Sequence, residues 1–414
     1  MMKRNSLTIA AVLIAAFILA AAPGASAGQG KAEHWTTMVT PKPLSDNVNK
    51  GLQWLTEHQL KSGGWGQGEE SESMGHGMDN LKAVANVADT CIATLALLRS
   101  GSTPAKGGYS KNITRAVEYL CSEVEKSDDK GLSVTSVKGT RVQAKLGPYI
   151  DTFMAALILS EVKGKMADGK GNDRVAAALR KTLRKIEQNQ KSDGTWDNQG
   201  WAPTLSQSMA GKALNRASQT GEKVNEQVRQ KTETYARGQF DGKTGAFKKD
   251  GSAGVDLYSS AANLGAMQDS ANTNQMKMKE AEQRLKGTKS ESERKEIQGQ
   301  IARYQQNDKD LRAAQEAVVK RMDDKAFIQG FGSNGGEEFL SYMNIGESLV
   351  TKGGKEWTKW DSSMTGNLNN IQNKDGSWTG HHCITGRTFC TAAALLVLMV
   401  DRTPVPVAAK MKGK

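Results

Sequence analysis

Apolar residues recur along most of this chain in stretches of helical length, separated by short glycine-rich breaks. Two kinds of stretch alternate: an amphipathic one with polar residues along one side, then a nearly continuous apolar one dense in Ala and Leu. An amphipathic helix covers a core with one face, whereas a helix that is apolar all round is buried. The pattern therefore predicts an all-α protein built from helix pairs, each with an outer helix followed by an inner one.

The predicted inner helices begin at a shared position in the repeat. Aligned on their apolar residues, they start with Asp89, Asp151, Ser206, Asp256, Glu338 and Arg387. About six helix pairs are expected on this basis, with glycine-rich turns leading into the inner helices. Because each turn comes before an inner helix, all the turns and all the inner-helix N-termini are expected on one face, which we call the rim.

A three-residue motif precedes several of the inner helices: a Gln, a Gly four positions later and a Trp two positions after that. It occurs at Gln59, Gly63 and Trp65, at Gln190, Gly194 and Trp196, and at Gln372, Gly376 and Trp378. Lys50 to Trp65 (KGLQWLTEHQLKSGGW) resembles the QW motif of the prenyltransferase and squalene-oxidase repeat family at every defining position. In that family the motif is structural, its Gln bonding to a helix end and its Trp packing on that Gln. The resemblance implies an α/α toroid, the double ring of terpenoid cyclases and protein prenyltransferases, over residues 44–402.

One polar and charged segment, residues 273–322, interrupts the repeats. Its few large apolar residues, from Ile297 to Met322, recur at heptad-like spacing, and Ser290 with Glu293 is a capping-box signature. We predict two antiparallel helices, paired like a coiled coil, that project from the ring as an inserted hairpin. Such a hairpin either contacts a protein partner or is a solvated spacer, because charge-rich helices often have no partner.

The N-terminus has the pattern of an export signal. Residues 1–27 carry Lys3 and Arg4, then an apolar run, and end on Ala25-Ser26-Ala27, the small-residue pattern that signal peptidase recognises. The apolar run is shorter than the roughly 20 residues of a membrane-spanning helix. A removed signal peptide, a periplasmic or secreted location and no transmembrane segment are therefore expected.

The chain carries a formal charge of +12, but its basic residues are scattered. They lie on predicted outer helices and in a basic C-terminal tail, residues 403–414, without the interleaved aromatic residues on which single-stranded nucleic acid stacks. A solvated surface is the simpler account, and no nucleic-acid partner is expected. Residues 28–43 are interpreted as an N-terminal extension ahead of the ring.

Chemistry is expected at the rim, because only there do residues distant in sequence converge. Helix N-termini also favour anions or carboxylates. A divergent isomerase similar to the terpenoid cyclases would use Asp89, Asp151 and Asp256 as catalytic acids. These three residues, and Ser206, are also of the types that cap helix N-termini, and recurrence at one register is what capping predicts.

A zinc site is the alternative chemistry at the rim. In protein prenyltransferases an Asp-x-Cys pair at the start of one inner helix and a His from the next hold the catalytic zinc, and Asp89-Thr90-Cys91 resembles that pair. The next inner helix offers Asp151 and no His. Closure of the ring would therefore have to bring His381 or His382 beside Asp89 and Cys91 to complete the ligand set.

The four cysteines have a simpler account in an exported protein, since oxidising compartments favour disulfides. Either Cys383 pairs with Cys390 within one turn, or Cys91 pairs with Cys390 across the closure of the ring. Cys121 lies on an apolar helix face, where a buried thiol is the expected state.

Several activities known on this type of ring lack their signatures here. The Asp-x-Asp-Asp cluster with which squalene and hopene cyclases protonate their substrate is absent, as is the Gly-Cys-Gly-Glu-Gln thioester motif. Aromatic residues make up only 6% of the chain, few for a cavity that stabilises carbocations, and prenyl transfer needs a cytosolic diphosphate donor. The sequence favours a toroid that binds a ligand or partner at the rim, with the isomerase and the zinc enzyme as alternatives.

Overall fold

The computed structural model describes residues 35–71, 79–197 and 199–410. The chain divides into two units, Met1–Glu33 and His34–Lys414, and every described residue belongs to the second. The predicted signal peptide, residues 1–27, lies outside the described residues, as do the last four residues of the basic tail.

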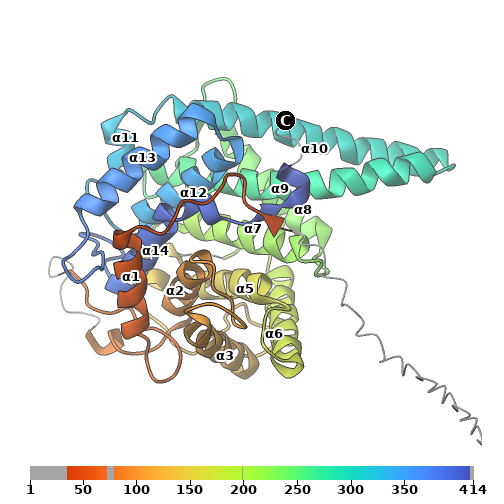
Figure 1. Ribbon diagram of the computed structural model, residues 1–414. Helices are drawn as coiled ribbons and strands as arrows, with labels where there is room; N and C mark the ends of the chain where they lie inside the picture. Colours follow the sequence, from red (N-terminus) through yellow and green to blue (C-terminus); the bar gives the residue numbers. More distant parts are fainter. Residues whose placement is uncertain (1–34, 72–78, 198, 411–414) are drawn as a thin grey trace, which may run out of the picture. The chain divides into compact units, whose positions relative to one another are not determined.

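Six helices form the inner ring of the second unit (Figure 1). They are α2 (Val87–Arg99), α5 (Ile150–Val162), α7 (Pro203–Gln219), α9 (Asp256–Gly287), α12 (Gly336–Lys352) and α14 (Arg387–Leu398). Each packs against the next in this order, and α14 packs against α2. The inner ring is therefore closed, which confirms the all-α toroid of helix pairs expected from the sequence pattern.

Amphipathic helices surround the inner ring, as the alternating pattern predicts. They are α1 (Asp46–Glu57), α3 (Ser110–Lys126), α6 (Gly169–Gln188), α8 (Glu226–Gly238) and α13 (Gly354–Asn370). The sixth outer position belongs to the C-terminal half of α10 (Glu291–Val319), followed by the short α11 (Lys325–Gln329). There Gln315 donates hydrogen bonds to Gln268 of α9 and to Ser348 of α12.

Short elements complete the unit. They are β1 (Trp35–Thr36) paired antiparallel with β4 (Val405–Pro406), β2 (Phe240–Asp241) paired with β3 (Ala246–Phe247), the 3-10 turns η2 (Asp79–Leu81) and η3 (Val400–Arg402), α4 (Arg141–Leu146) and α15 (Val407–Lys410). None of the described helices is both long enough and apolar enough to cross a membrane.

Each of the three repeated tryptophans forms a hydrogen bond between the turn in which it lies and the outer helix before that turn. Trp65, Trp196 and Trp378 are fully buried, and each indole N–H donates to a backbone carbonyl ten residues earlier, at 2.7 to 2.8 Å. A buried indole N–H normally requires such a partner. The repeat in the sequence is therefore a repeat of one hydrogen bond.

The glutamines of the same motif join neighbouring repeats. Gln59 donates a hydrogen bond to the carbonyl of Asn112 in the first turn of α3, at 2.9 Å. Gln190 donates in the same way to the carbonyl of Val228 in α8, at 3.0 Å. Gln372, in the last repeat, donates to the carbonyl of Asn47 in α1 at 2.9 Å. This last bond joins the two ends of the repeat series, so the motif also closes the outer ring.

The motif glycines permit this contact between repeats. Gly63 has a φ of +93°, and a Cβ added there would lie 2.4 Å from the carbonyl oxygen of Arg115 in α3. Real Cβ atoms do not approach an oxygen so closely, and a positive φ is strained for residues with a side chain. Glycine is therefore required at this position for the next outer helix to pack.

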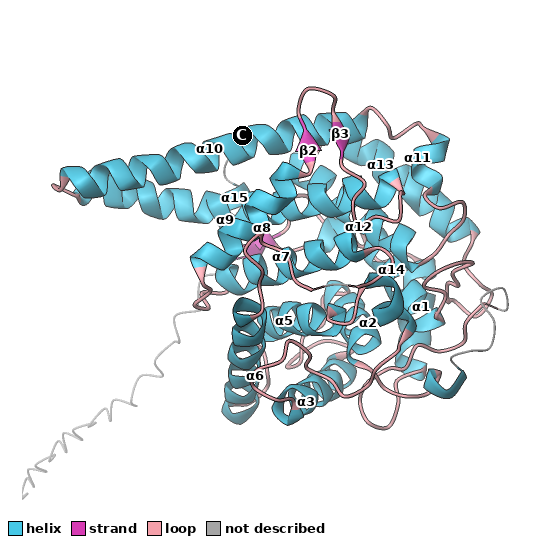
Figure 2. Ribbon diagram, turned by 180° about the vertical axis from the view of Figure 1, so that it is seen from behind, coloured by secondary structure: helices cyan, strands magenta, loops and turns pink. Residues whose placement is uncertain are grey.

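The helices α9 and α10 extend beyond the ring as an antiparallel pair (Figures 1 and 2). Ser290 caps α10, because its Oγ accepts a hydrogen bond from the backbone N–H of Glu293 at 3.3 Å. The inner helix α9 runs without a break from Asp256 to Gly287. The hairpin expected at 273–322 therefore has no boundary at residue 273. Its first helix is the C-terminal part of the inner helix α9.

Candidate functional site

The starts of the six inner helices meet on one face, as the order of turns and helices predicts. Each neighbouring pair shares a contact between its starting segments: Ala88 N to Asp151 Oδ1, Ala202 N to Lys145 O, Thr204 N to Gly251 O, Tyr258 to Glu338, Gly336 N to Ile384 O, and Thr388 N to Gln67 O. We call this face the N-terminal mouth of the ring. It is where the starting segments of all six inner helices meet.

The other end of the ring is filled by buried charged side chains. Three cations and three anions from five inner helices lie there: Arg99, Glu161, Lys212, Arg216, Asp269 and Glu347. Arg99 binds Glu161 through two hydrogen bonds of 2.6 and 2.8 Å. Lys212 lies 2.5 Å from Glu347 and 2.9 Å from Asp269. Against the effect of burial, Arg99 and Arg216 lower the pKa of Glu161 to about 2, so this carboxylate stays ionised.

Both terminal segments cover that charged network. Arg216 donates to the carbonyl of Pro404 at 2.8 Å, and its guanidinium lies 4.8 Å from the centre of the Trp35 ring. Thr403 donates to Glu347 at 3.2 Å, and β1 and β4 pair beside these residues. Among the described residues, the charged network is therefore covered at this end of the ring.

Asp89 lies at this mouth, but it does not cap α2 as the sequence suggested. Asn86 is the capping residue, since its Oδ1 accepts from Asp89 N at 2.9 Å, and its side-chain amide donates to Asp89 Oδ2 at 2.7 Å. Asp89 Oδ1 is buried without a hydrogen-bond partner. Burial, with smaller effects from the charges of Asp151 and Glu70, raises the pKa of Asp89 to about 7.

Asp151 caps a neighbouring helix and not its own. Its Oδ1 accepts from the backbone N–H of Ala88 in α2 at 3.0 Å, and its Oδ2 accepts from the Gln143 side chain at 2.8 Å. Burial raises the pKa of Asp151 to about 6, although these two hydrogen bonds oppose the rise. The register predicted from the sequence is correct, but the cap acts between repeats.

Asp256 and Ser206 do not join the other rim acids. Asp256 is partly exposed and forms ion pairs with Lys249 at 2.8 Å and Arg321 at 3.2 Å. Its carboxylate is therefore paired with basic residues and not with the other acids of the mouth. Ser206 is the fourth residue of α7, and its buried hydroxyl has no hydrogen-bond partner. Neither side chain caps its helix, which corrects the expectation from residue type.

The predicted zinc ligands do not assemble. Within residues 35–71, 79–197 and 199–410, no three His, Cys, Asp or Glu side chains are placed to hold one metal ion. Cys91 is buried in the core with its pKa raised well above the usual value by burial. His382 instead contacts the carbonyl of Ser333 at 2.6 Å, and the backbone N–H of the exposed His381 bonds to Asn334. These four side chains, Asp89 among them, do not fit a zinc site.

The expected disulfides are also absent from the described residues. Cys91, Cys121, Cys383 and Cys390 are all free and buried. The Cys390 thiol donates to the carbonyl of Ile384 at 3.2 Å, which orients it within its own turn. Cys121 is buried against an apolar helix face, as expected.

A second acidic centre, formed by Glu337 and Glu338 at the start of α12, was not singled out as a pair from the sequence. Glu337 Oε2 accepts from the backbone N–H of Ile384 at 3.1 Å, and its Oε1 is buried without a partner. Burial, with the neighbouring charge of Glu338, raises the pKa of Glu337 to about 8. The signal was present in the sequence as two consecutive acids opening an apolar helix, directly after Gly335-Gly336.

Glu338 has several partners from other elements. Its Oε1 accepts from the hydroxyl of Tyr258 in α9 and from the backbone N–H of Phe331. Its Oε2 has no hydrogen-bond partner and lies 3.4 Å from His382 Nε2. Burial raises the pKa of Glu338, while His382 and Tyr258 oppose that rise. Three separate segments thus converge on one carboxyl group of α12.

Aromatic side chains lie on the surface above this carboxyl group. Phe331 is 53% exposed, and its ring meets the Trp201 ring edge to face with 5.2 Å between centres. The ring of His382 lies 5.1 Å away on another side, and the Lys145 ammonium lies 5.3 Å from the centre of the Trp201 ring. The N-terminal mouth therefore offers apolar ring faces close to hydrogen-bonding groups.

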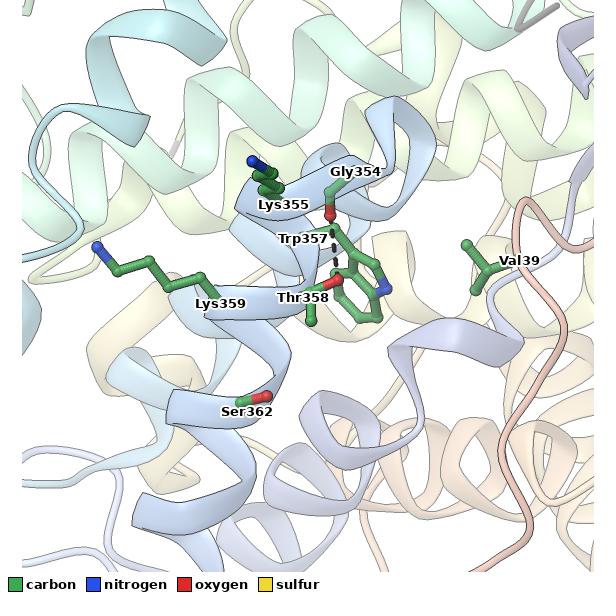
Figure 3. Close-up of a pocket in the computed structure, with 7 residues that line it drawn as sticks. All are labelled: Val39, Gly354, Lys355, Trp357, Thr358, Lys359 and Ser362. Atoms are coloured by element: carbon green, nitrogen blue, oxygen red, sulfur yellow. Dashed lines mark hydrogen bonds between the residues drawn. The ribbon is translucent and has the colours of Figure 1, made fainter.

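The structure also has surface hollows that do not include the buried acidic residues of the mouth. The larger one, of about 740 Å³, lies between α13 and Val39, with Trp357 in its wall (Figure 3). Its Lys359 is already paired with Asp323 at 2.5 Å. Because α13 begins where α12 ends, this hollow lies at the end of the ring opposite the mouth. A smaller hollow of about 330 Å³ lies at the mouth face itself, beside Trp54 and Arg387 at the start of α14.

No family model and no curated protein matches this chain. Among solved structures, an inactive variant of an α-1,6-mannanase from Salegentibacter sp., in complex with α-1,6-mannotriose, has a TM-score of 0.52 and 8% identity over 86% of this chain and 98% of the mannanase. A variant of a type II terpene cyclase from Scytonema, in complex with its product merosterolic acid A, has a TM-score of 0.48 and 11% identity over 86% and 96%. The similarity to the mannanase shows an α/α-toroid fold, and membership of the QW repeat family stays a prediction.

Proposed function

We propose that this protein is an exported α/α toroid that binds a ligand at the N-terminal mouth of its inner ring, without the chemistry of the terpenoid cyclases. The observation that carries the proposal is a set of buried carboxyl oxygens without protein donors, namely Asp89 Oδ1, Glu337 Oε1 and Glu338 Oε2. A buried acceptor left unpaired costs about 1–3 kcal/mol. Donors on a ligand would recover that free energy.

The ion pairs that fill the interior of the ring favour a ligand-binding role at the mouth and argue against cyclase chemistry inside the ring. A terpenoid cyclase needs an enclosed apolar cavity, whereas the interior here contains ion pairs such as Arg99 with Glu161 and Lys212 with Glu347. Trp35, Thr403 and Pro404 cover these pairs from the other side. The remaining approach is toward the carboxyl groups and aromatic rings of the N-terminal mouth.

Acid–base catalysis at the same mouth is the second candidate. Asp89, with a pKa of about 7, and Glu337, with a pKa of about 8, hold protons near neutral pH, as a general acid requires. The mannanase of the comparison is inactive with two consecutive aspartates replaced, and Glu337 and Glu338 are consecutive acids here. A catalytic role predicts turnover that falls as the pH rises through about 8, whereas a binding role predicts no turnover.

Binding can be tested by titration calorimetry on the mature chain with three probe classes: neutral trisaccharides, farnesyl diphosphate and inorganic pyrophosphate. We expect one class to bind with one site per chain, and Glu337→Gln to weaken that binding tenfold or more. Thr358→Ala, in the hollow on α13, is the matched control and should bind like the parent. Binding that is lost in Thr358→Ala but kept in Glu337→Gln would place the ligand elsewhere, and no binding by any class would contradict the proposal.

Export is part of the proposal and has its own test. The pattern Ala25-Ser26-Ala27 predicts cleavage that leaves Gly28 as the first residue. N-terminal sequencing of the protein recovered outside the cytoplasm should begin at Gly28. Recovery of the chain only from the cytoplasm, with Lys3 and Arg4 still present, would contradict export.

A further inference from the structure

Residues 330–335 lie directly over Glu338. The backbone N–H of Phe331 donates to Glu338 Oε1 at 3.1 Å. A Cβ added at Gly330 would lie 2.6 Å from Oε1 of this carboxyl group, and one added at Gly335 would lie 3.0 Å from Oε2. Glycine at these two positions therefore lets the segment approach more closely than residues with a side chain could.

Only a few contacts hold the segment to its surroundings. His382 bonds to the carbonyl of Ser333 at 2.6 Å, and the backbone N–H of His381 bonds to Asn334 at 2.7 Å. The Phe331 ring rests on Trp201 and is itself about half exposed. Gly330 and Gly332 have φ values of +65° and +132°, which glycine adopts without strain. A segment with few buried apolar contacts opens at a low free-energy cost.

Glu338 beneath the segment, and Glu337 next to it in α12, have the properties of a binding site and not of a closed core. Each keeps one buried oxygen without a hydrogen-bond partner, and the side chains of both are fully buried. Folded proteins rarely leave buried polar atoms unpaired, and such atoms call for an explanation. Displacement of the covering segment would expose Glu338 Oε2, the oxygen beneath Gly335, to a ligand.

We propose that Glu337 and Glu338 form the floor of a sugar-binding site and that residues 330–335 are the lid that opens to admit the sugar. The inference rests on the proposed function, because it identifies the ligand class and the entry route at the same mouth. With the lid displaced, Trp201 stands at the edge of the opening, and Phe331 moves with the lid and can close over the bound sugar. The carboxyl groups of the floor then face the incoming ligand.

The chemistry of the lining selects a neutral polyhydroxylated ring. A sugar has an apolar C–H face that stacks on aromatic rings such as Trp201 and Phe331, and hydroxyls that both donate and accept hydrogen bonds. The unpartnered oxygens of Glu337 and Glu338 would exchange hydrogen bonds with those hydroxyls, which can donate to an ionised carboxylate or accept from a protonated carboxyl group. An isoprenoid chain has no hydrogen-bonding group for these oxygens and no hydroxyl-bearing ring to stack on the aromatic side chains.

The lid can be tested by the reactivity of Cys383, a free thiol that is 5% exposed and follows His382 directly. Tyr258→Phe and Glu338→Gln remove or weaken contacts of the carboxyl group that holds the lid. We expect both variants to speed the labelling of this thiol by a disulfide reagent at least fivefold under native conditions. The Cys383→Ser variant shows that the labelling occurs at this thiol, because the labelling should then disappear. The other three thiols, those of Cys91, Cys121 and Cys390, are more deeply buried. Labelling as slow in both variants as in the parent, with circular dichroism unchanged, would overturn the lid.

The ligand class is tested with cellotriose, chitotriose, laminaritriose and α-1,6-mannotriose against farnesyl diphosphate and pyrophosphate. We expect at least one trisaccharide to bind and to slow Cys383 labelling, with Phe331→Ala and Trp201→Ala weakening binding tenfold or more. Ile371→Ala, which truncates an exposed apolar residue at the end of α13, is the matched control. If only farnesyl diphosphate or pyrophosphate binds at the mouth, the sugar assignment fails and the proposed function stands. If no probe binds, both fail.

Discussion

The carboxylate of Asp151, at the start of the inner helix α5, accepts a hydrogen bond from the backbone N–H of Ala88, 3.0 Å away in α2. Ala88 is the second residue of α2, where a backbone N–H has no partner within its own helix. One repeat therefore satisfies the helix end of the repeat before it. The contact is structural and also fixes a titratable group at the N-terminal mouth.

Replacement of Asp151 should destabilise the junction between these two repeats. Asp151→Ala removes the acceptor for Ala88 N and for the Gln143 side chain, and the loss of two buried hydrogen bonds should cost about 1–3 kcal/mol. Asp151→Asn keeps one oxygen of the same shape and should cost less. Urea denaturation of the three proteins measures the order, and equal stability of Asp151→Ala and the parent would contradict the role of this contact.

The buried tryptophans give a second stability prediction. Trp65→Ala or Trp196→Ala should each cost roughly 3–5 kcal/mol, because a large buried ring is removed and its packing cannot recover. Trp65→Phe should cost less, since it keeps most of the ring and leaves only the carbonyl of Leu55 without its indole donor. Thermal and urea unfolding check the order. A loss below 1 kcal/mol in both alanine variants would contradict the repeat model.

The pH dependence of stability should reflect the raised pKa of the mouth acids. Burial raises the pKa of Glu337 to about 8, of Asp89 to about 7 and of Asp151 to about 6. Each binds its proton more tightly in the folded state than in the unfolded one. Their contribution is therefore complete below the unfolded pKa of about 4 and is lost as the pH rises through the folded values.

We accordingly expect the melting temperature to fall steadily from pH 5 to pH 9. Glu337→Gln, which cannot ionise, should flatten the upper part of this slope between pH 7 and pH 9. Glu161, whose pKa is lowered to about 2, contributes in the opposite sense and only below about pH 4.5. Calorimetric scans of the two proteins in matched buffers measure the slopes. Identical slopes would show that Glu337 does not titrate as described.

The buried charge network predicts strong effects from removing one cation. Lys212→Met leaves Asp269 and Glu347 buried without their shared partner and should cost about 3–5 kcal/mol. Replacing Lys212 and Asp269 together with apolar residues of similar size should cost less than the single change, because two cations and two anions then remain in the network. Urea unfolding of the two variants decides between these outcomes. A single variant as stable as the parent would show that the ion pairs contribute little.

The helical hairpin should be dispensable for folding of the ring. Replacing residues 279–300 with a short glycine linker removes the projecting ends of α9 and α10 but keeps Gln315 and its contacts between helices. We expect a melting temperature within a few degrees of the parent and unchanged ligand binding at the mouth. If the shortened chain does not fold, the hairpin is required for folding of the ring and the prediction is wrong. If the shortened chain folds but no longer binds ligand, the hairpin has a role in function.

Local patterns in the sequence predict the helices and their order well. Trp65 and Gln59 recur because each repeat makes the same bonds, so period and fold could be inferred together. The roles of single polar residues were predicted less well. Asn86 and not Asp89 caps α2, and Asp151 caps a helix of another repeat, because both outcomes depend on contacts between segments far apart in sequence.

The candidate site shows the same limit. His382 was expected beside zinc, but the closed ring places it against Glu338, a residue of the preceding repeat. Lys212 and Glu347 lie inside helices that a hydrophobic pattern treats as core, and only their mutual distance of 2.5 Å reveals the network. Glu337 and Glu338 were visible as adjacent acids. Their unpartnered oxygens depend on the packing of residues 330–335 and could not be inferred from the sequence.

Hydrogen–deuterium exchange of the mature chain with and without a bound trisaccharide tests the central claim most directly. Binding at the N-terminal mouth predicts slower exchange in residues 330–340 and 381–390, with no change in residues 354–362 of α13 or in the hairpin around residues 279–300. Protection confined to α13 or to the hairpin would contradict the claim. So would a saturating ligand that leaves the exchange of residues 330–340 unchanged.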